Sequence, residues 1–231
     1  MAPIRHIATG RRSVDVEVYR PTGAGPFPGV LLLHELIGLT DQVRADAADL
    51  ASRGYLVWCP DLFTGGAASY CIRRFFTPAG LGNHADAQVR EVGALLDTLK
   101  VDPDCDRRLG MIGMCMTGGF VLHMAKRDDL AAPVVYHHAP GITGAGIPAA
   151  DAAQIRGPVQ GHFAADDRIC PKRRPAQLKA ALGDRLDLHV HADAGHGLRS
   201  RFRATAAGAA AWSETLAFLD RQLGARPSAV C

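Results

Sequence analysis

A cysteine, an aspartate and a histidine of the types used in nucleophilic catalysis stand at turn-like positions of this 231-residue chain. Cys115 lies between a short apolar run and the pair Gly118-Gly119. A cysteine on a tight strand-to-helix turn has the position of a nucleophile, and the positive end of the following helix favours its thiolate. The alternative is a buried, inert cysteine, because free cysteines are among the most buried residues.

A thiol nucleophile needs a base, and the base needs a carboxylate to orient it. Asp167 follows a predicted strand at 159–163, and His196 follows another at 186–190. Asp166 is a rival for the role of the acid. The chain order of nucleophile, acid and histidine is found in α/β-hydrolases and differs from those of chymotrypsin and subtilisin.

The elements that must position these residues alternate along the chain. Apolar runs predict strands at 13–19, 29–33, 55–59, 107–112, 133–136, 159–163 and 186–190. Helical periodicity predicts helices at 41–53, 84–100, 118–125 and 204–223. This alternation predicts one α/β domain over residues 1–231, with a mostly parallel central sheet, helices on both faces, and flexible ends at 1–12 and 224–231.

Composition excludes several classes of partner. The net charge is +3, and the densest basic run, Lys172 to Arg174, is predicted to be a solvated loop or a helix start. No apolar segment is long enough for a membrane helix or a signal peptide. The six cysteines are irregularly spaced and lack zinc-ligand spacing. We therefore expect a cytoplasmic protein with free thiols, without nucleic-acid or membrane partners, and with no cofactor or metal.

Several segments together resemble the dienelactone hydrolase family of α/β-hydrolases. The resemblance extends from about 13 to 223 and so predicts an α/β-hydrolase fold. One difference is Thr117, because many members have glycine two places after the nucleophile, and this puts the geometry of the turn in question. The matching segments are His34-Glu35-Leu36-Ile37-Gly38-Leu39, Gly54-Tyr55 with Cys59-Pro60-Asp61-Leu62, Gly113-x-Cys115 with Gly118-Gly119, Asp167-x-x-x-Pro171, and Gly195-His196-Gly197.

The resemblance implies a role for each site residue. Cys115 is the nucleophile, His196 the base, and Asp167 the acid that orients His196, since the spacing to Pro171 favours it over Asp166. The backbone N–H groups of Leu36 and Met116 would form the oxyanion hole. The carboxylate of Glu35 would lie near the thiol and oppose the helix dipole, because an acidic neighbour disfavours thiolate.

A cysteine nucleophile forms a thioester, which suits small esters and lactones with a stable leaving group and suits amides poorly. We expect such a substrate, carrying a carboxylate where arginines line the pocket, and a monomer or homodimer. Ordinary surface roles are the alternative for each candidate contact. The candidate substrate-binding residues are Tyr70, Arg73, Arg74, His138, Arg199 and Arg201.

Other functions stay open at this point. One is a different thiol enzyme, either amidotransferase-like or a redox thiol protein, and another is a non-catalytic binding protein on the same scaffold. His189 and His191 share one face of a strand, but the sequence shows no third metal ligand near them. His137 and His138 follow a strand at the predicted site edge, where one of them could line the pocket.

Overall fold

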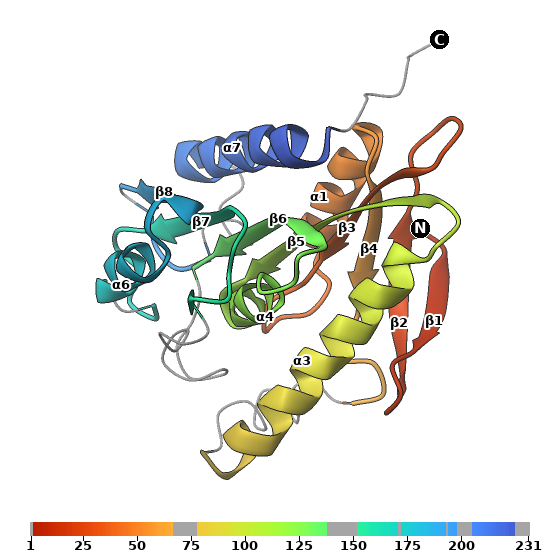
Figure 1. Cartoon of the computed structure of the whole chain (residues 1–231), viewed down its shortest axis with the longest axis horizontal. Helices are drawn as coiled ribbons and strands as arrows, with labels where there is room; N and C mark the ends of the chain where they lie inside the picture. The colour runs from red at the N-terminus through yellow and green to blue at the C-terminus, as the bar shows by residue number, and fades with distance from the viewer. Residues whose placement is uncertain are drawn as a thin grey trace.

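A single sheet organises the chain in the computed structural model, which describes residues 2–66, 78–137, 152–170, 172–192, 194–197 and 205–224. The sheet has eight strands in the order β1-β2-β4-β3-β5-β6-β7-β8 (Figure 1). Its strands are β1 Ile4–Ala8, β2 Ser13–Tyr19, β3 Phe27–Leu32, β4 Leu56–Pro60, β5 Cys105–Met114, β6 Leu130–Tyr136, β7 Val159–Ala164 and β8 Leu186–His191.

The sheet is mostly parallel. β1 pairs with β2 and β2 with β4 in antiparallel fashion, whereas β3 to β8 run parallel to their neighbours. β3 and β5 lie side by side, and β5, β6, β7 and β8 follow each other in chain order. Loops after these parallel strands therefore open at one edge of the sheet, where open α/β folds bind their ligands.

Helices cover both faces of the sheet (Figure 1). On one face, α1 and α7 pack through residues such as Leu50 and Leu219, and on the other, α3, α4 and α6 pack through residues such as Leu95, Val121 and Leu178. None of the described helices is both long and apolar enough to cross a membrane. The helices are α1 Asp41–Ser52, α3 Pro78–Lys100, α4 Gly118–Met124, α6 Arg173–Leu182 and α7 Ala206–Leu223.

The predicted α/β fold is confirmed, with three differences at its margins. β1 lies within the N-terminal segment predicted to be flexible, and it forms by pairing with β2 although most of its residues are exposed. α3 begins at Pro78, six residues before the predicted start. α6 is not among the predicted helices; it begins at Arg173, which confirms the predicted helix start in the basic run, and the side chain of Arg174 is buried.

Candidate active site

Cys115 stands on a strained turn at the end of β5. Its φ is +53°, a value that non-glycine residues rarely adopt. A single 3₁₀ turn, Cys115–Thr117, joins β5 directly to α4, and the side chain of Cys115 is buried with the residue only 4% exposed. Because such strain persists only where the surroundings hold it in place, the turn has the features of a functional position.

Two residues of this turn explain how it is held. The hydroxyl of Thr117 accepts a hydrogen bond from the backbone N–H of Met114 at 2.8 Å and donates one to the carbonyl of the same residue at 3.1 Å. Gly113 approaches α4 so closely that a Cβ there would lie 2.6 Å from the carbonyl oxygen of Thr117. Threonine in place of the family's glycine therefore closes the turn with its side chain instead of distorting it.

The structure brings Cys115, His196 and Asp167 together from three different loops. Nε2 of His196 lies 3.0 Å from Sγ of Cys115, and Nδ1 lies 2.8 Å from Oδ2 of Asp167. These residues follow β5, β8 and β7, respectively, at the same edge of the sheet. Nucleophile, base and acid types are thus in hydrogen-bonding contact in the order that a catalytic triad requires.

Asp167, not its neighbour Asp166, meets the histidine. Its second carboxylate oxygen, Oδ1, accepts hydrogen bonds from the N–H groups of Ile169 and Cys170, both at 2.8 Å. Burial acts to raise the pKa of Asp167, but hydrogen bonds from His196, Cys170 and Ile169 outweigh it, and the pKa lies below the usual value. Asp166 is largely exposed, 3.8 Å from the Lys172 amine.

The environment of His196 favours its protonated form. Burial lowers the pKa of the imidazole, but hydrogen bonds to Asp167 and Cys115, together with their charges, raise it to about 10. A histidine that holds its proton between a carboxylate and a sulfur stabilises negative charge on the sulfur. The structure therefore places an imidazole that holds its proton 3.0 Å from the sulfur of Cys115.

Glu35 and Leu36 follow β3, which lies next to β5. Glu35 is buried, at 8% exposed, but in the described part of the chain the thiol is hydrogen-bonded to His196 and not to Glu35. The buried His34 fixes this turn: its Nδ1 donates to the carbonyl of Glu35 at 2.6 Å, and its Nε2 accepts from the N–H of Leu62 at 2.9 Å. The turn after β3 is thereby tied to the loop after β4.

His137 is a site neighbour that the sequence could only suggest. It follows β6, and its ring centroid lies 4.9 Å from that of His196. Neither of its buried ring nitrogens has a hydrogen-bond partner among the described residues, and burial lowers its pKa to about 3. A neutral imidazole therefore borders His196. The sequence signal was the pair of histidines after a strand, of which only His137 is described.

Part of the predicted site lies outside the described residues. This applies to all six candidate substrate contacts, namely Tyr70, Arg73, Arg74, His138, Arg199 and Arg201. For Met116 the structure describes the backbone, which directly follows Cys115 on the turn, but not the side chain.

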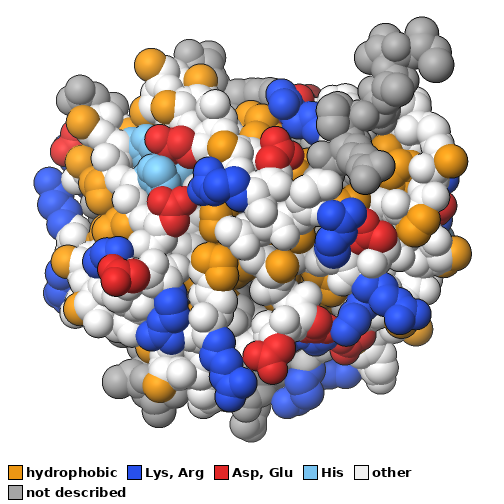
Figure 2. Space-filling model, turned by 45° about the horizontal axis from the view of Figure 1, so that its top comes forward, with side chains coloured by type: hydrophobic (Ala, Val, Ile, Leu, Met, Phe, Trp, Pro, Cys, Tyr) orange, Lys and Arg blue, Asp and Glu red, His pale blue; other side chains and the backbone are white. Residues whose placement is uncertain are grey.

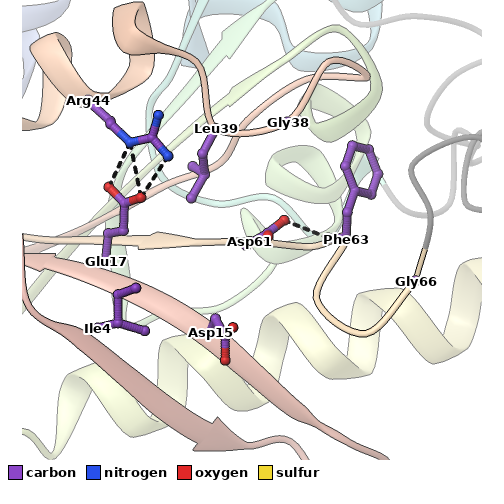
Figure 3. A pocket seen from close by; sticks show the side chains of 9 residues that line it. All are labelled: Ile4, Asp15, Glu17, Gly38, Leu39, Arg44, Asp61, Phe63 and Gly66. Carbon is purple, nitrogen blue, oxygen red and sulfur yellow. Dashed lines mark hydrogen bonds and ion pairs between the residues drawn. The ribbon is translucent and has the colours of Figure 1, made fainter.

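A separate cleft of about 420 Å³ lies on the side of the sheet carrying β1, β2 and β4. Asp15, Glu17 and Asp61 give it an acidic lining, and Arg44 pairs with Glu17 at 2.9 Å (Figure 3). Cys115, Asp167 and His196 are not among the residues that line it. This cleft is therefore separate from the cluster of Cys115, His196 and Asp167.

Comparison with known proteins places the chain in a family. The sequence model of the dienelactone hydrolase family matches residues 14–223. The carboxymethylenebutenolidase of Rhodococcus opacus is 29% identical over 225 residues, which cover 87% of this chain and 83% of the relative.

Solved structures agree in fold. A dienelactone hydrolase-like promiscuous phosphotriesterase from metagenomic libraries superposes with a TM-score of 0.80 at 21% identity, covering 97% of this chain and 99% of that one. A cold-adapted esterase from an Arctic intertidal metagenomic library superposes with a TM-score of 0.74 at 19% identity, covering 95% and 93%. With the family match over most of its length, the chain belongs to the dienelactone hydrolase family and is a hydrolase of the ester and lactone class.

Proposed function

We propose that this protein hydrolyses small esters or lactones with Cys115 as nucleophile, His196 as base and Asp167 as orienting acid. The observation that carries the proposal is the continuous contact from Sγ of Cys115 through both nitrogens of His196 to Asp167, at 3.0 and 2.8 Å. The strained turn of Cys115 adds support, because it presents the sulfur between a buried strand and a helix start.

The reaction has two halves. The thiolate sulfur forms a bond to the substrate carbonyl carbon, and the resulting oxyanion accepts hydrogen bonds from the N–H groups of Leu36 and Met116. The carbon–oxygen bond to the leaving group then breaks, and His196 donates its proton to that oxygen, leaving a thioester on Cys115. Water next loses a proton to His196 and attacks the thioester, which releases the acid and restores the thiolate.

Glu35 is proposed to restrain the thiol through its charge. It lies buried in the turn that follows β3, beside the strand that carries Cys115. A carboxylate near the sulfur opposes the thiolate, whereas the imidazolium of His196 favours it. The balance of the two keeps the free enzyme less reactive toward other electrophiles until a substrate occupies the site.

Lactones bearing a carboxylate are the proposed substrate class. A relative carries the name carboxymethylenebutenolidase, which denotes an enzyme that acts on a lactone with a carboxylate-bearing side chain. Arg73, Arg74, Arg199 and Arg201 are proposed to bind that carboxylate, since the guanidinium group suits bidentate capture. A cytoplasmic location and a monomeric or homodimeric state stay predictions from the sequence.

The test combines a substrate panel with trapping of the intermediate. The wild-type protein should hydrolyse dienelactone and aryl esters, and mass spectrometry of protein quenched during turnover should find the acyl group on Cys115. Cys115→Ala and His196→Ala should each lose at least about 100-fold in kcat/KM.

Cys105→Ala is the matched control, because Cys105 is also buried and begins the same strand at its opposite end. It should retain wild-type activity. Turnover by Cys115→Ala at the wild-type rate, or an acyl group found on another residue, would exclude the proposed mechanism.

A further inference from the structure

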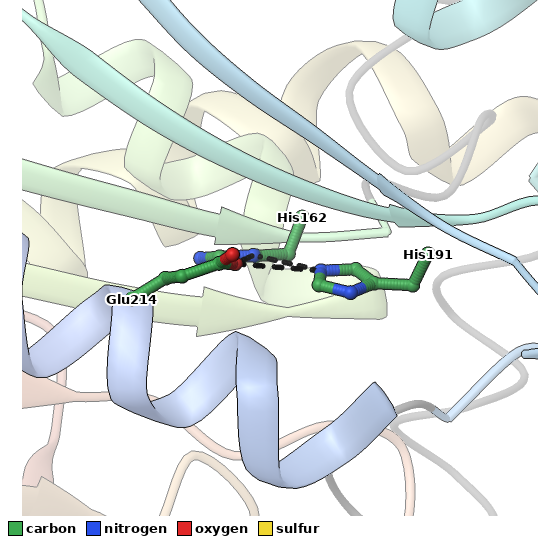
Figure 4. A group of neighbouring side chains, drawn as sticks. All are labelled: His162, His191 and Glu214. Atoms are coloured by element: carbon green, nitrogen blue, oxygen red, sulfur yellow. Dashed lines mark hydrogen bonds and ion pairs between the residues drawn. The ribbon is translucent and has the colours of Figure 1, made fainter. Parts of the chain in front are cut away.

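A cluster of histidines lies on the face of the sheet that α7 covers, apart from the catalytic contacts. His162 comes from β7, His191 from β8 and Glu214 from α7 (Figure 4). His189 comes from β8 as well. The three histidine rings lie against one another, with centroids 4.9 Å apart for His162 and His189, 5.4 Å for His162 and His191, and 6.4 Å for His189 and His191. The His162 side chain is fully buried, and those of His191 and Glu214 are 10% and 39% exposed.

Three atoms of the cluster have the separations of metal ligands. Nδ1 of His162 lies 3.1 Å from Nε2 of His191, and Oε2 of Glu214 lies 3.6 and 3.9 Å from these two nitrogens. A point equidistant from three atoms at these separations lies about 2.1 Å from each, within the ~2.0–2.2 Å range of zinc–nitrogen and zinc–oxygen bonds. No backbone movement is required to place an ion there.

A supporting residue sets the tautomer that metal binding requires. Nε2 of His162 lies 3.0 Å from Oε1 of Gln160, and the amide of Gln160 donates from its Nε2 to Oδ2 of Asp187 at 3.0 Å. The Gln160 amide oxygen thus faces Nε2 of His162 as an acceptor, and Oγ1 of Thr215 also lies 3.2 Å from that nitrogen. This favours the tautomer with the proton on Nε2, in which Nδ1 faces Nε2 of His191 at 3.1 Å. Metal-binding histidines are characteristically held in this way by an acceptor on the other ring nitrogen.

The charges around the cluster also suit a cation. The negatively charged Glu214 has its Oε2 atom buried with no hydrogen bond from the part of the chain that the structure describes, and this oxygen faces the nitrogens of His162, His189 and His191 at 3.2 to 3.9 Å. The remaining nitrogen of His189 faces Asp187 at 2.9 Å, and Asp187 pairs with Arg221 at 3.4 Å.

We propose that His162, His191 and Glu214 bind one divalent transition-metal ion of the zinc type. Two imidazoles and one carboxylate are ligands that such ions accept, and the fourth position is open to water. Histidine side chains reach the surface beside acidic ones on the α7 side of the molecule, which gives an ion a path from solvent (Figure 2).

The site is tied to the catalytic loops by the chain itself. His162 stands five residues before Asp167, and His191 stands five residues before His196. A bound ion therefore links the two strands that lead into the acid and base loops. This link stabilises the edge of the sheet formed by β7 and β8, independently of whether the proposed hydrolysis is correct.

Cobalt(II) is the probe, because its visible spectrum reports both binding and ligand type. All titrations use the full chain with Cys115→Ser, so that an ion cannot bind between that sulfur and His196. We expect one equivalent of Co²⁺ to bind without a sulfur-to-cobalt charge-transfer band, and Zn²⁺ to displace it. Added Zn²⁺ should also raise the Tm.

His191→Gln and Glu214→Gln are the test variants, since both side chains are partly exposed and their replacement spares the fully buried His162. Each should lower the Co²⁺ affinity at least about 10- to 100-fold, which is the loss typical when a residue that only supports a metal ligand is removed. Their metal-free Tm shows whether they fold.

His6→Gln is the matched control, because His6 lies 2.6 Å from Asp15 in an exposed histidine–carboxylate pair without a second histidine. It should bind Co²⁺ like the parent. The proposal would be overturned if folded His191→Gln and Glu214→Gln kept the Co²⁺ affinity of the parent. It would also be overturned if the Co²⁺ spectrum showed a thiolate charge-transfer band, or if the parent bound no Co²⁺.

Discussion

Gly113→Ala tests whether the turn at Cys115 places the sulfur. A Cβ at this position would lie 2.6 Å from the backbone oxygen of Thr117 and 2.6 Å from a methyl carbon of the buried Val121. Reaching ordinary van der Waals contact requires a displacement of about 0.8 Å or more. Neither atom can move away freely, because one belongs to the backbone of the turn and the other to the packed core.

The displacement predicts two magnitudes. Overpacking of this kind costs about 1–3 kcal/mol in the free energy of unfolding. A shift approaching 1 Å in a reacting group can cost on the order of 100-fold in rate, so we expect kcat to fall about 10- to 100-fold. Urea unfolding measures the first quantity, and hydrolysis of an aryl ester under saturating substrate measures the second.

Gly93→Ala is the control for this experiment. A Cβ at Gly93, inside α3, would meet only the sulfur of Met124, at 3.8 Å. Alanine in a helix interior should add about 0.5–1 kcal/mol to the free energy of unfolding, and the rate should stay at the wild-type value. If Gly113→Ala lost stability but kept full kcat, the turn would not be what positions the sulfur.

Three further perturbations have expected outcomes. Asp167→Asn should lower kcat by about 10²- to 10⁴-fold, because the amide no longer holds the His196 tautomer or its charge, and steady-state kinetics measures the loss. Folding raises the pKa of His196 from 6.5 to about 10, so the contribution of this residue to the free energy of unfolding is fully present below pH 6.5 and is lost as the pH rises toward 10. Urea unfolding at a series of pH values should show this decline. The decline should be smaller in Asp167→Asn. Arg12→Ala should lower the free energy of unfolding by about 3 kcal/mol, because it leaves the buried carboxylate of Glu91 without the guanidinium that contacts it at 2.7 and 2.8 Å. Urea unfolding measures this loss, and a change near zero would contradict the prediction.

Most of the sheet could be predicted because its strands are apolar runs bounded by glycine and proline. The segment Gly29 to Leu33, for example, is continuous and apolar, as a strand buried on both faces must be. β1 could not be predicted in this way, because Ile4 to Ala8 is mostly exposed and has no regular alternation. It becomes a strand only through its pairing with β2, which is a tertiary effect.

The site was predictable in its chain order but not in its surroundings. Cys115, Asp167 and His196 each follow a strand, and parallel strands bring such positions to one edge. The resemblance to a known family chose Asp167 over Asp166, and the structure places Asp167 in contact with His196. The role of Thr117 could not be derived, because nothing in the sequence shows that its hydroxyl bonds both backbone groups of Met114.

The histidine cluster shows a different limit. The sequence placed His189 and His191 on one strand face, and no third ligand was visible near them. His162 and Glu214 are remote in the chain and reach the cluster only because β7 pairs with β8 and α7 packs over both. The structure also makes His162, not His189, the partner of His191.

The order of the strands along the chain has a consequence for the newly synthesised protein. Segments nearer the N-terminus leave the ribosome first, so β5 and the turn of Cys115 emerge before β7 and β8. A nascent chain that has not yet reached residue 196 carries the cysteine without the imidazole that lies 3.0 Å from its sulfur in the folded protein. The contact between Cys115 and His196 therefore forms only after β8 has emerged, and under the proposed mechanism the thiol is not activated before that point.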